Sequence, residues 1–95
     1  CMIGGHLATN AGGLRVIKFG SLHNVILGME VVLANGTKLD MLRNIHKDNC
    51  GYPLKHAFIG SEGTLGVITK VCLKLAIKPK YTSVLLLKVS AMYMH

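Results

Sequence analysis

The sequence predicts an α+β fold in which antiparallel strands are combined with short helices and two glycine-rich loops. Three observations lead to this prediction. Residues 25–34 and 37–42 are apolar-rich runs on either side of Asn35-Gly36, which is typical of a β-hairpin. Residues 67–77 alternate apolar and polar side chains in their middle, which is typical of a half-buried strand. Glycine clusters within residues 4–13 and 60–66 indicate the two loops.

The N-terminal segment is predicted to hold a loop and then one helical turn. Residues 4–13 are rich in Gly, Ala, Thr and Asn, so several positions are free to take a positive φ. Residues 14–20 are long enough for a single turn of helix. The first ordered strand is therefore expected only after residue 20.

The hairpin is the clearest element of the pattern. Residues 25–34 are dense in β-branched and large apolar side chains, which favours a strand. Asn35-Gly36 predicts a type I′ turn, which needs a positive φ at both central positions. Residues 37–42 then return as the partner strand, with Lys38 and Asp40 on one face.

A turn and a short helix are predicted between the hairpin and the second glycine cluster. Residues 46–51 are polar and turn-like. Pro53 suits the first position of a helix, where its missing amide N–H costs nothing. The helix is expected to run through residues 54–58 and to end at Gly60.

The C-terminal segment is predicted to contain a strand, a break and a second strand. In residues 67–77, Val71, Leu73 and Leu75 alternate with polar neighbours. Residues 78–80 (Lys-Pro-Lys) read as a linker between domains, and residues 82–89 read as the first strand of a following domain.

Composition and charge limit the classes of function. Apolar residues make up 51% of the chain and charged residues only 16%, which argues against disorder. Eleven basic residues against four acidic ones give a formal charge of +7. A basic balance favours anionic partners, but nucleic-acid binding is disfavoured because the chain has no Trp and no basic run longer than a pair. We expect acidic segments of a longer protein to offset this charge.

The cysteine, histidine and apolar patterns predict no disulfide framework, metal site or membrane span. The 3 cysteines form no C-x-x-C pair, which favours a reducing compartment. The 5 histidines have no H-x-H or H-x-x-x-H spacing and are expected at the surface or the edge of the core. The longest apolar stretches are shorter than the roughly 18–20 residues that cross a bilayer.

The first glycine cluster, residues 4–13 (GGHLATNAGG), leaves the backbone bare. A planar or phosphorylated ligand could approach its amides closely, and Thr9 and Asn10 add a hydroxyl and a side-chain amide. Spacing alone leaves open the alternative of two tight turns without a ligand. The segment is not a Walker loop, because no Gly-Lys-Ser/Thr follows, and it lacks the Rossmann G-x-G-x-x-G.

The second cluster, residues 60–69 (GSEGTLGVIT), runs from a loop into a strand. Its three glycines let the chain bend sharply and expose amides. Val67 and Ile68 offer apolar surface suited to a planar ring. Glu62 could accept a hydrogen bond from a ligand hydroxyl, although its position alone favours a role in capping the loop.

Both clusters resemble motifs of the PCMH-type FAD-binding domain in flavoproteins of the vanillyl-alcohol oxidase type. GGHLATNAGG is similar to the first motif and GSEGTLGVIT to the closing motif, in the same order and at a similar separation. Residues 27–37 and 47–55 narrow the resemblance to the D-2-hydroxyglutarate dehydrogenase family, whose relatives include D-lactate dehydrogenases and glycolate oxidase flavoprotein subunits. The resemblance covers about residues 1–80.

The resemblance implies the second subdomain of a PCMH-type FAD-binding domain in residues 1–80 and the start of a truncated substrate domain in residues 81–95. It implies FAD as the cofactor and carries over no catalytic residue, because the catalytic histidine, the metal ligands and the substrate-binding Arg and Lys belong to the substrate domain. The residues that it places at the cofactor are Gly4, Gly5, Thr9, Asn10, Ala11, Gly12, Glu62, Gly63, Thr64, Leu65, Gly66, Val67 and Ile68.

The function that the resemblance implies is that of a mitochondrial FAD-dependent dehydrogenase converting D-2-hydroxyglutarate to 2-oxoglutarate. Electrons would pass from the flavin to an acceptor protein or a quinone, and the small 2-hydroxy acid would be held by the substrate domain. The segment alone is expected to be inactive. A D-lactate dehydrogenase or glycolate oxidase relative is one alternative, a non-catalytic interaction module is another, and a nucleic-acid-binding module ranks last.

Overall fold

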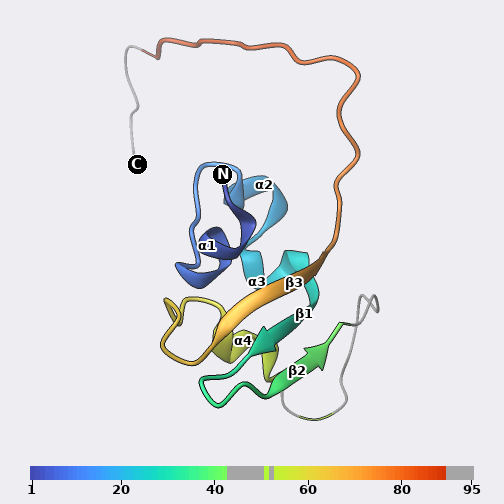
Figure 1. Cartoon of the computed structure of the whole chain (residues 1–95). Coiled ribbons are helices and arrows are strands. Elements are labelled where there is room, and N and C mark those ends of the chain that lie inside the picture. Colours follow the sequence, from blue (N-terminus) through green and yellow to red (C-terminus); the bar gives the residue numbers. More distant parts are fainter. Residues whose placement is uncertain (43–50, 52, 90–95) are drawn as a thin grey trace.

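Three antiparallel strands form the centre of the molecule. The computed structural model describes residues 1–42, 51 and 53–89. Strand β1 (Ile26–Val32) lies between β2 (Lys38–Met41) and β3 (Val67–Leu73), and it pairs antiparallel with both (Figure 1). The predicted α+β class and the strands of the hairpin are therefore confirmed.

The helices that accompany the sheet are short. They are α1 (Ile3–Ala8), α2 (Val16–Phe19), α3 (Leu22–Val25) and α4 (Lys55–Phe58). The single turns predicted within residues 14–20 and 54–58 are confirmed as α2 and α4. Isolated helices shorter than about 12–15 residues are marginal in water, so packing against the sheet must stabilise these elements.

Helix α1 corrects the prediction of a loop over residues 4–13. The loop begins only at Thr9, and in residues 4–13 the residue with a positive φ is Asn10, at 50°, and none of the glycines. The side chain of Leu7 explains the helix, because it is fully buried in the core. Burying a leucine contributes about 1.5–3 kcal/mol, which offsets the roughly 1 kcal/mol that each helical glycine costs relative to alanine.

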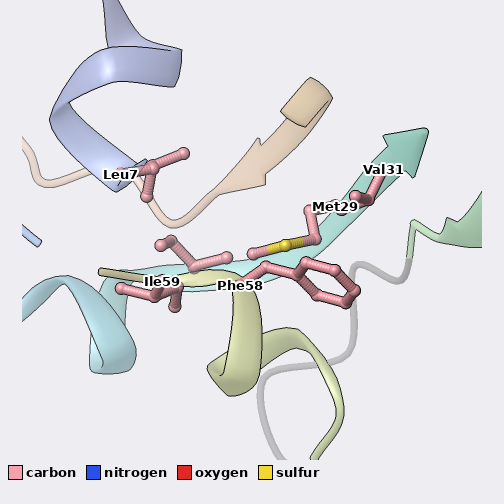
Figure 2. Close-up of a cluster of buried hydrophobic side chains, with 6 residues drawn as sticks. Leu7, Met29, Val31, Phe58 and Ile59 are labelled. Atoms are coloured by element: carbon pink, nitrogen blue, oxygen red, sulfur yellow. The ribbon is translucent and has the colours of Figure 1, made fainter. Parts of the chain in front are cut away.

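The core lies between β1, α1 and the end of α4. Figure 2 shows apolar side chains from these three elements pointing toward one another. Partly buried side chains from β2 and β3, including Leu39, Ile68 and Val71, pack against this cluster. The buried members of the cluster are Leu7, Ile26, Met29, Val31, Phe58 and Ile59.

The hairpin turn differs in type from the prediction. The amide of Gly36 donates to the carbonyl oxygen of Leu33 at 2.9 Å, and the amide of Leu33 donates to the carbonyl oxygen of Thr37, also at 2.9 Å. Gly36 has a φ of 82°, whereas Asn35 is not in the left-handed region. This is the three-residue loop in which a type I turn is followed by a left-handed glycine, so the predicted type I′ turn is wrong.

Replacing Gly36 with alanine is expected to lower the free energy of unfolding by about 1–2 kcal/mol, because an L-residue is strained at this φ. No atom lies within 4 Å of a Cβ added at Gly36, so the effect isolates the backbone. Gly5→Ala is the matched control: its added Cβ also meets nothing within 4 Å, but Gly5 lies in α1, where alanine is expected to stabilise. Urea denaturation of both variants measures the difference, and effects of the same sign would contradict this account.

A β-bulge at Thr69 changes the face that β3 presents to the core. Glu30 pairs with Lys70 and Val31 pairs with Ile68, so Thr69 is the extra residue on β3. Ile68 and Val71 therefore both pack against the core, although they are three positions apart. The alternation predicted for the middle of this strand follows the bulge, where Val71 and Leu73 both pack against the core.

The chain after β3 has no regular structure over residues 74–89. The predicted strand over residues 67–77 ends at Leu73, and the predicted strand over residues 82–89 is not formed, since neither segment has a partner strand there. We call residues 74–89 the C-terminal arm, which runs away from the sheet in orange in Figure 1.

The turn predicted at residues 46–51 lies, except for Gly51, outside the described residues. Within the described part of the chain, no helix has the length and apolar character of a membrane span.

Candidate functional site

The two glycine-rich motifs are joined by hydrogen bonds. The amide of Gly60 donates to the carbonyl oxygen of Leu7 at 3.0 Å, and the amide of Glu62 donates to that of Ala8 at 2.9 Å. The last carbonyl groups of a helix have no partner within the helix. The second motif therefore caps the C-terminal end of α1 and brings the two motifs, distant in the sequence, to one place.

Glycines allow this contact. Gly60 has a φ of 79°, and a Cβ added to it would lie 3.3 Å from the Cβ of Asn10. A Cβ added to Gly4 would lie 3.7 Å from the carbonyl oxygen of Ile68, which is ordinary contact. The backbones of the two motifs thus approach one another closely, most tightly at Gly60.

Each motif contains one non-glycine residue in the left-handed region. They are Asn10, with a φ of 50°, and Glu62, with a φ of 51°. Every other residue with a positive φ in the ranges 1–42 and 53–89 is a glycine. Such positions are uncommon and store strain, and they cluster at functional sites. The backbone strain of the described chain is therefore concentrated where the motifs meet.

Several backbone amides of both motifs donate hydrogen bonds to carbonyl oxygens of the protein. This corrects the expectation that the amides of the motifs are free to bind a ligand. In the first motif, the amides of Thr9, Asn10 and Ala11 donate to carbonyl oxygens of residues 5–7. In the second, the amide of Thr64 donates to Ser61, in addition to the two bonds that cap α1. Of these amides, those of Gly60 and Glu62 join the two motifs, and all of them are committed to acceptors of the protein, so contacts with a ligand must come from other groups.

The structure places the predicted site residues in three settings. Gly4 and Gly5 lie in α1, Val67 and Ile68 begin β3, and the others lie in the two connecting loops. Thr9, Asn10, Gly12, Glu62, Gly63, Thr64, Leu65 and Val67 are exposed, whereas Gly4, Ala11, Gly66 and Ile68 are half-buried. Leu65 and Val67 are the large apolar side chains of this set that are exposed to a ligand, with exposed fractions of 51% and 65%.

Gly66 has a structural role that the sequence did not reveal. A Cβ at this position would lie 2.8 Å from Cγ1 of Val31 and 2.8 Å from the carbonyl oxygen of Val32. The second motif therefore passes directly against β1 at Gly66. The sequence signal was the glycine itself, but the neighbour that requires it lies on a different element.

Glu30 is a buried carboxylate that the sequence analysis did not single out. Thr69 Oγ1 donates to its Oε1 at 2.8 Å, Lys70 Nζ donates to its Oε2 at 3.1 Å, and Lys38 Nζ lies 3.8 Å from Oε2. The hydrogen bonds from Thr69 and Lys70 lower the pKa of Glu30 below its usual value, against the opposing effect of burial. Glu30 is thus held as a charged partner of the flanking strands, and nothing leaves it poised to take a proton.

His23 and His56 form a pair between α3 and α4. Their Nδ1 atoms lie 2.7 Å apart and their ring centroids 4.8 Å apart. Burial lowers the pKa of His56 below its ordinary value of 6.5, and the charges of His23 and Lys55 lower it further. Both rings are half-buried, which agrees with histidine at the edge of the core, but their pairing could not be predicted from spacing.

Acid is expected to destabilise the fold through this pair. Because the folded-state pKa of His56 lies below its unfolded value, the unfolded chain binds more protons as the pH falls below about 6.5. Stability is therefore complete above that pH and declines below it. Thermal unfolding between pH 7.5 and 5.5 measures the decline, and His56→Gln is expected to show a shallower one. If the stability of this variant depended on pH in the same way as that of the parent, His56 would not be the cause of the decline.

The first part of the chain is similar to a known protein family. Residues 1–41 match the family model for the FAD binding domain. Over these residues, which include the first glycine-rich motif, the chain is similar to an FAD binding domain. The cofactor predicted from the two motifs is therefore confirmed.

Relatives extend the match along most of the chain. The mitochondrial D-2-hydroxyglutarate dehydrogenases of Arabidopsis thaliana and Bos taurus are each 60% identical over 84 residues, covering 88% of this chain and 15% of the relative. A solved structure of alkyldihydroxyacetonephosphate synthase is 34% identical with a TM-score of 0.69, covering 83% of this chain and 14% of that protein. The resemblance drawn from the motifs is confirmed, and the chain spans about 15% of the length of the curated relatives.

Proposed function

We propose that the chain is the FAD-binding portion of a mitochondrial D-2-hydroxy acid dehydrogenase that oxidises D-2-hydroxyglutarate. The observation that carries this proposal is the junction of the two motifs, in which amides of Gly60 and Glu62 cap α1. The names of the relatives support the substrate and the compartment. The synthase has a similar segment under a different reaction name, so we infer that this segment serves the cofactor and that other parts determine the reaction.

The described residues fit a flavin through shape and apolar contact. Leu65 and Val67 expose apolar side chains beside the junction, and glycines on both motifs leave the backbone open to a planar ring. Asn10 and Glu62 lie exposed in the same region, where a side-chain amide and a carboxylate can bind hydroxyl groups. Bound FAD would supply the hydride acceptor, while this segment would position it and exclude water from one face.

We further infer a division at about residue 80. Residues 1–80 would form part of the flavin domain, and residues 81–95 would begin the domain that holds the 2-hydroxy acid. Within the described part of the arm, large apolar side chains are solvent-exposed, including Leu85 at 80% and Leu87 at 73%, which suits a segment that packs elsewhere. An electron-acceptor protein or a quinone would complete the reaction cycle.

Reconstitution with FAD tests the proposal. The chain is fused to the first subdomain of a flavin domain from a relative, and quenching of FAD fluorescence is measured during titration. The fusion is expected to bind FAD, whereas the chain alone is expected to quench little because it supplies one side of the site. A fusion that folds but ignores FAD would end the proposal.

Matched variants locate the binding surface. Leu65→Ser with Val67→Ser is expected to weaken FAD binding in the fusion, because both side chains are exposed at the motif junction. Leu85→Ser with Leu87→Ser removes comparable apolar surface from the C-terminal arm and is expected to leave binding unchanged. Equal losses in the two double variants would place the flavin elsewhere.

A further inference from the structure

A second candidate site lies away from the glycine motifs. An open cavity of about 1380 Å³ is lined by residues of α2, α3 and α4, of the start of β1 and of the first part of the C-terminal arm. The residues assigned to FAD by resemblance are absent from its described lining. Sites for small molecules usually occupy about 300–1,000 Å³, so this cavity is large for a single small anion.

The cavity is strongly basic. Its cationic side chains come from the α2 region, α4 and the C-terminal arm, and they are Arg15, Lys18, Lys55, Lys74 and Lys78. Among the described residues of its lining there is no Asp or Glu. Clefts lined by one sign of charge focus the potential and attract ligands of the opposite sign.

Two of these cations are held in position by their surroundings. Lys55 Nζ donates to the carbonyl oxygens of Ile26 and Leu27 at 3.2 and 3.0 Å. Lys18 Nζ lies over the ring of Phe19, 5.3 Å from its centroid. The His23–His56 pair lies in the same wall, and the charge of Lys55 helps to keep His56 from taking up a proton. The positive charge of this wall is therefore a fixed feature of the fold.

The carboxylate side chains in the described part of the chain lie elsewhere. Glu30 binds Thr69 and Lys70 on the sheet, and Asp40 Oδ1 accepts from the amide of Leu42 at 3.0 Å. Glu62 lies in the second motif, whose residues are not in the lining. Neutralisation of the cavity by these three residues is therefore excluded.

Apolar side chains line the same cavity. Leu14, Leu75 and Ile77 have exposed fractions of 89%, 85% and 97%. Residues 75–82 lie in no helix or strand, so these side chains are presented by an irregular segment. A ligand that fills the cavity must therefore combine carboxylates with apolar groups.

We propose that this cavity is a docking site for a polypeptide segment in which several carboxylates alternate with apolar side chains. Such a segment matches the charge of the lining, its exposed apolar groups and its size together. An inorganic anion matches the charge alone. The proposal does not depend on FAD binding, since the two sites share no described residue.

A binding assay with the full 95-residue chain tests the proposal. The probe is a fluorescein-labelled twelve-residue peptide of alternating Glu and Leu, followed by fluorescence anisotropy at low and at physiological salt. The double variant Lys18→Gln with Lys78→Gln removes one charge from α2 and one from the C-terminal arm. It is expected to weaken binding about five- to tenfold. Lys80→Gln with Lys88→Gln removes the same net charge outside the lining and is expected to change binding less than about twofold.

Three outcomes would overturn the proposal. Equal losses in the two double variants would show attraction to net charge alone. Equal binding of a peptide with Gln in place of Glu would remove the role of the carboxylates. Displacement of the probe by inorganic phosphate or by FAD at similar concentrations would make the cavity a small-anion or nucleotide site. Circular dichroism of each variant establishes that the fold is retained.

Discussion

Replacing Gly66 with alanine is expected to lower the free energy of unfolding by about 1–3 kcal/mol, which is the usual effect of overpacking. The added Cβ would lie 2.8 Å from Val31 Cγ1 and from the carbonyl oxygen of Val32. The Val31 side chain could rotate, but the Val32 carbonyl belongs to the central strand. Relief therefore requires β3 to move away from β1, and the junction with α1 moves with it.

Urea denaturation of Gly66→Ala measures this loss, and Gly13→Ala is the matched control. Gly13 has no positive φ, and a Cβ added there meets nothing within 4 Å, so its stability is expected to stay within about 0.5 kcal/mol of the parent. In the FAD-binding fusion, Gly66→Ala is also expected to weaken quenching. A variant as stable as the control would mean that β1 and β3 do not approach as closely as described.

Replacing Leu7 with alanine is expected to have the largest effect, about 2–5 kcal/mol. Its side chain is fully buried and belongs to the core cluster that Figure 2 shows. A domain of this length is stable by only about 0.05–0.15 kcal/mol per residue, so the loss is a large fraction of the total. We expect the variant to be partly unfolded at 37 °C and to lose protection of the Gly60 amide, whose acceptor lies on Leu7.

Leu14→Ala provides the comparison for Leu7→Ala. Leu14 has an exposed fraction of 89%, so the same truncation is expected to change the unfolding midpoint little. Thermal unfolding followed by circular dichroism, with hydrogen exchange at Gly60, distinguishes the two variants. If both truncations had the same effect, Leu7 would not be the anchor of α1.

Elements with strong local signals could be predicted from the sequence. The β-branched run of β1 and the glycine turn after it fixed the hairpin, and Pro53 and Gly60 bounded α4. The two motifs indicated the cofactor because their residue order resembles that of a known domain. In each of these cases, the deciding interaction lies within a few residues of the pattern that predicts it.

Features that depend on distant partners could not be predicted. Helix α1 contains two glycines and is stabilised by the burial of Leu7, which no local pattern encodes. The bulge at Thr69 depends on its pairing opposite Glu30 and Val31. The cap on α1 could not be predicted, because the amides of Gly60 and Glu62 find their acceptors in the other motif. The His23–His56 pair joins α3 and α4, which are separated in the sequence by β1 and β2. The relative position of the two helices therefore depends on how these strands fold.

The cap on α1 has a consequence for how the protein matures. The carbonyl oxygen of Leu7 gains its second donor, and that of Ala8 its donor, only when Gly60 and Glu62 arrive, and the hairpin and α4 lie between them in the chain. During synthesis the first motif leaves the ribosome early, yet so short a helix cannot persist without its late partner. Competence to receive the cofactor should therefore appear abruptly, near the end of translation of this segment.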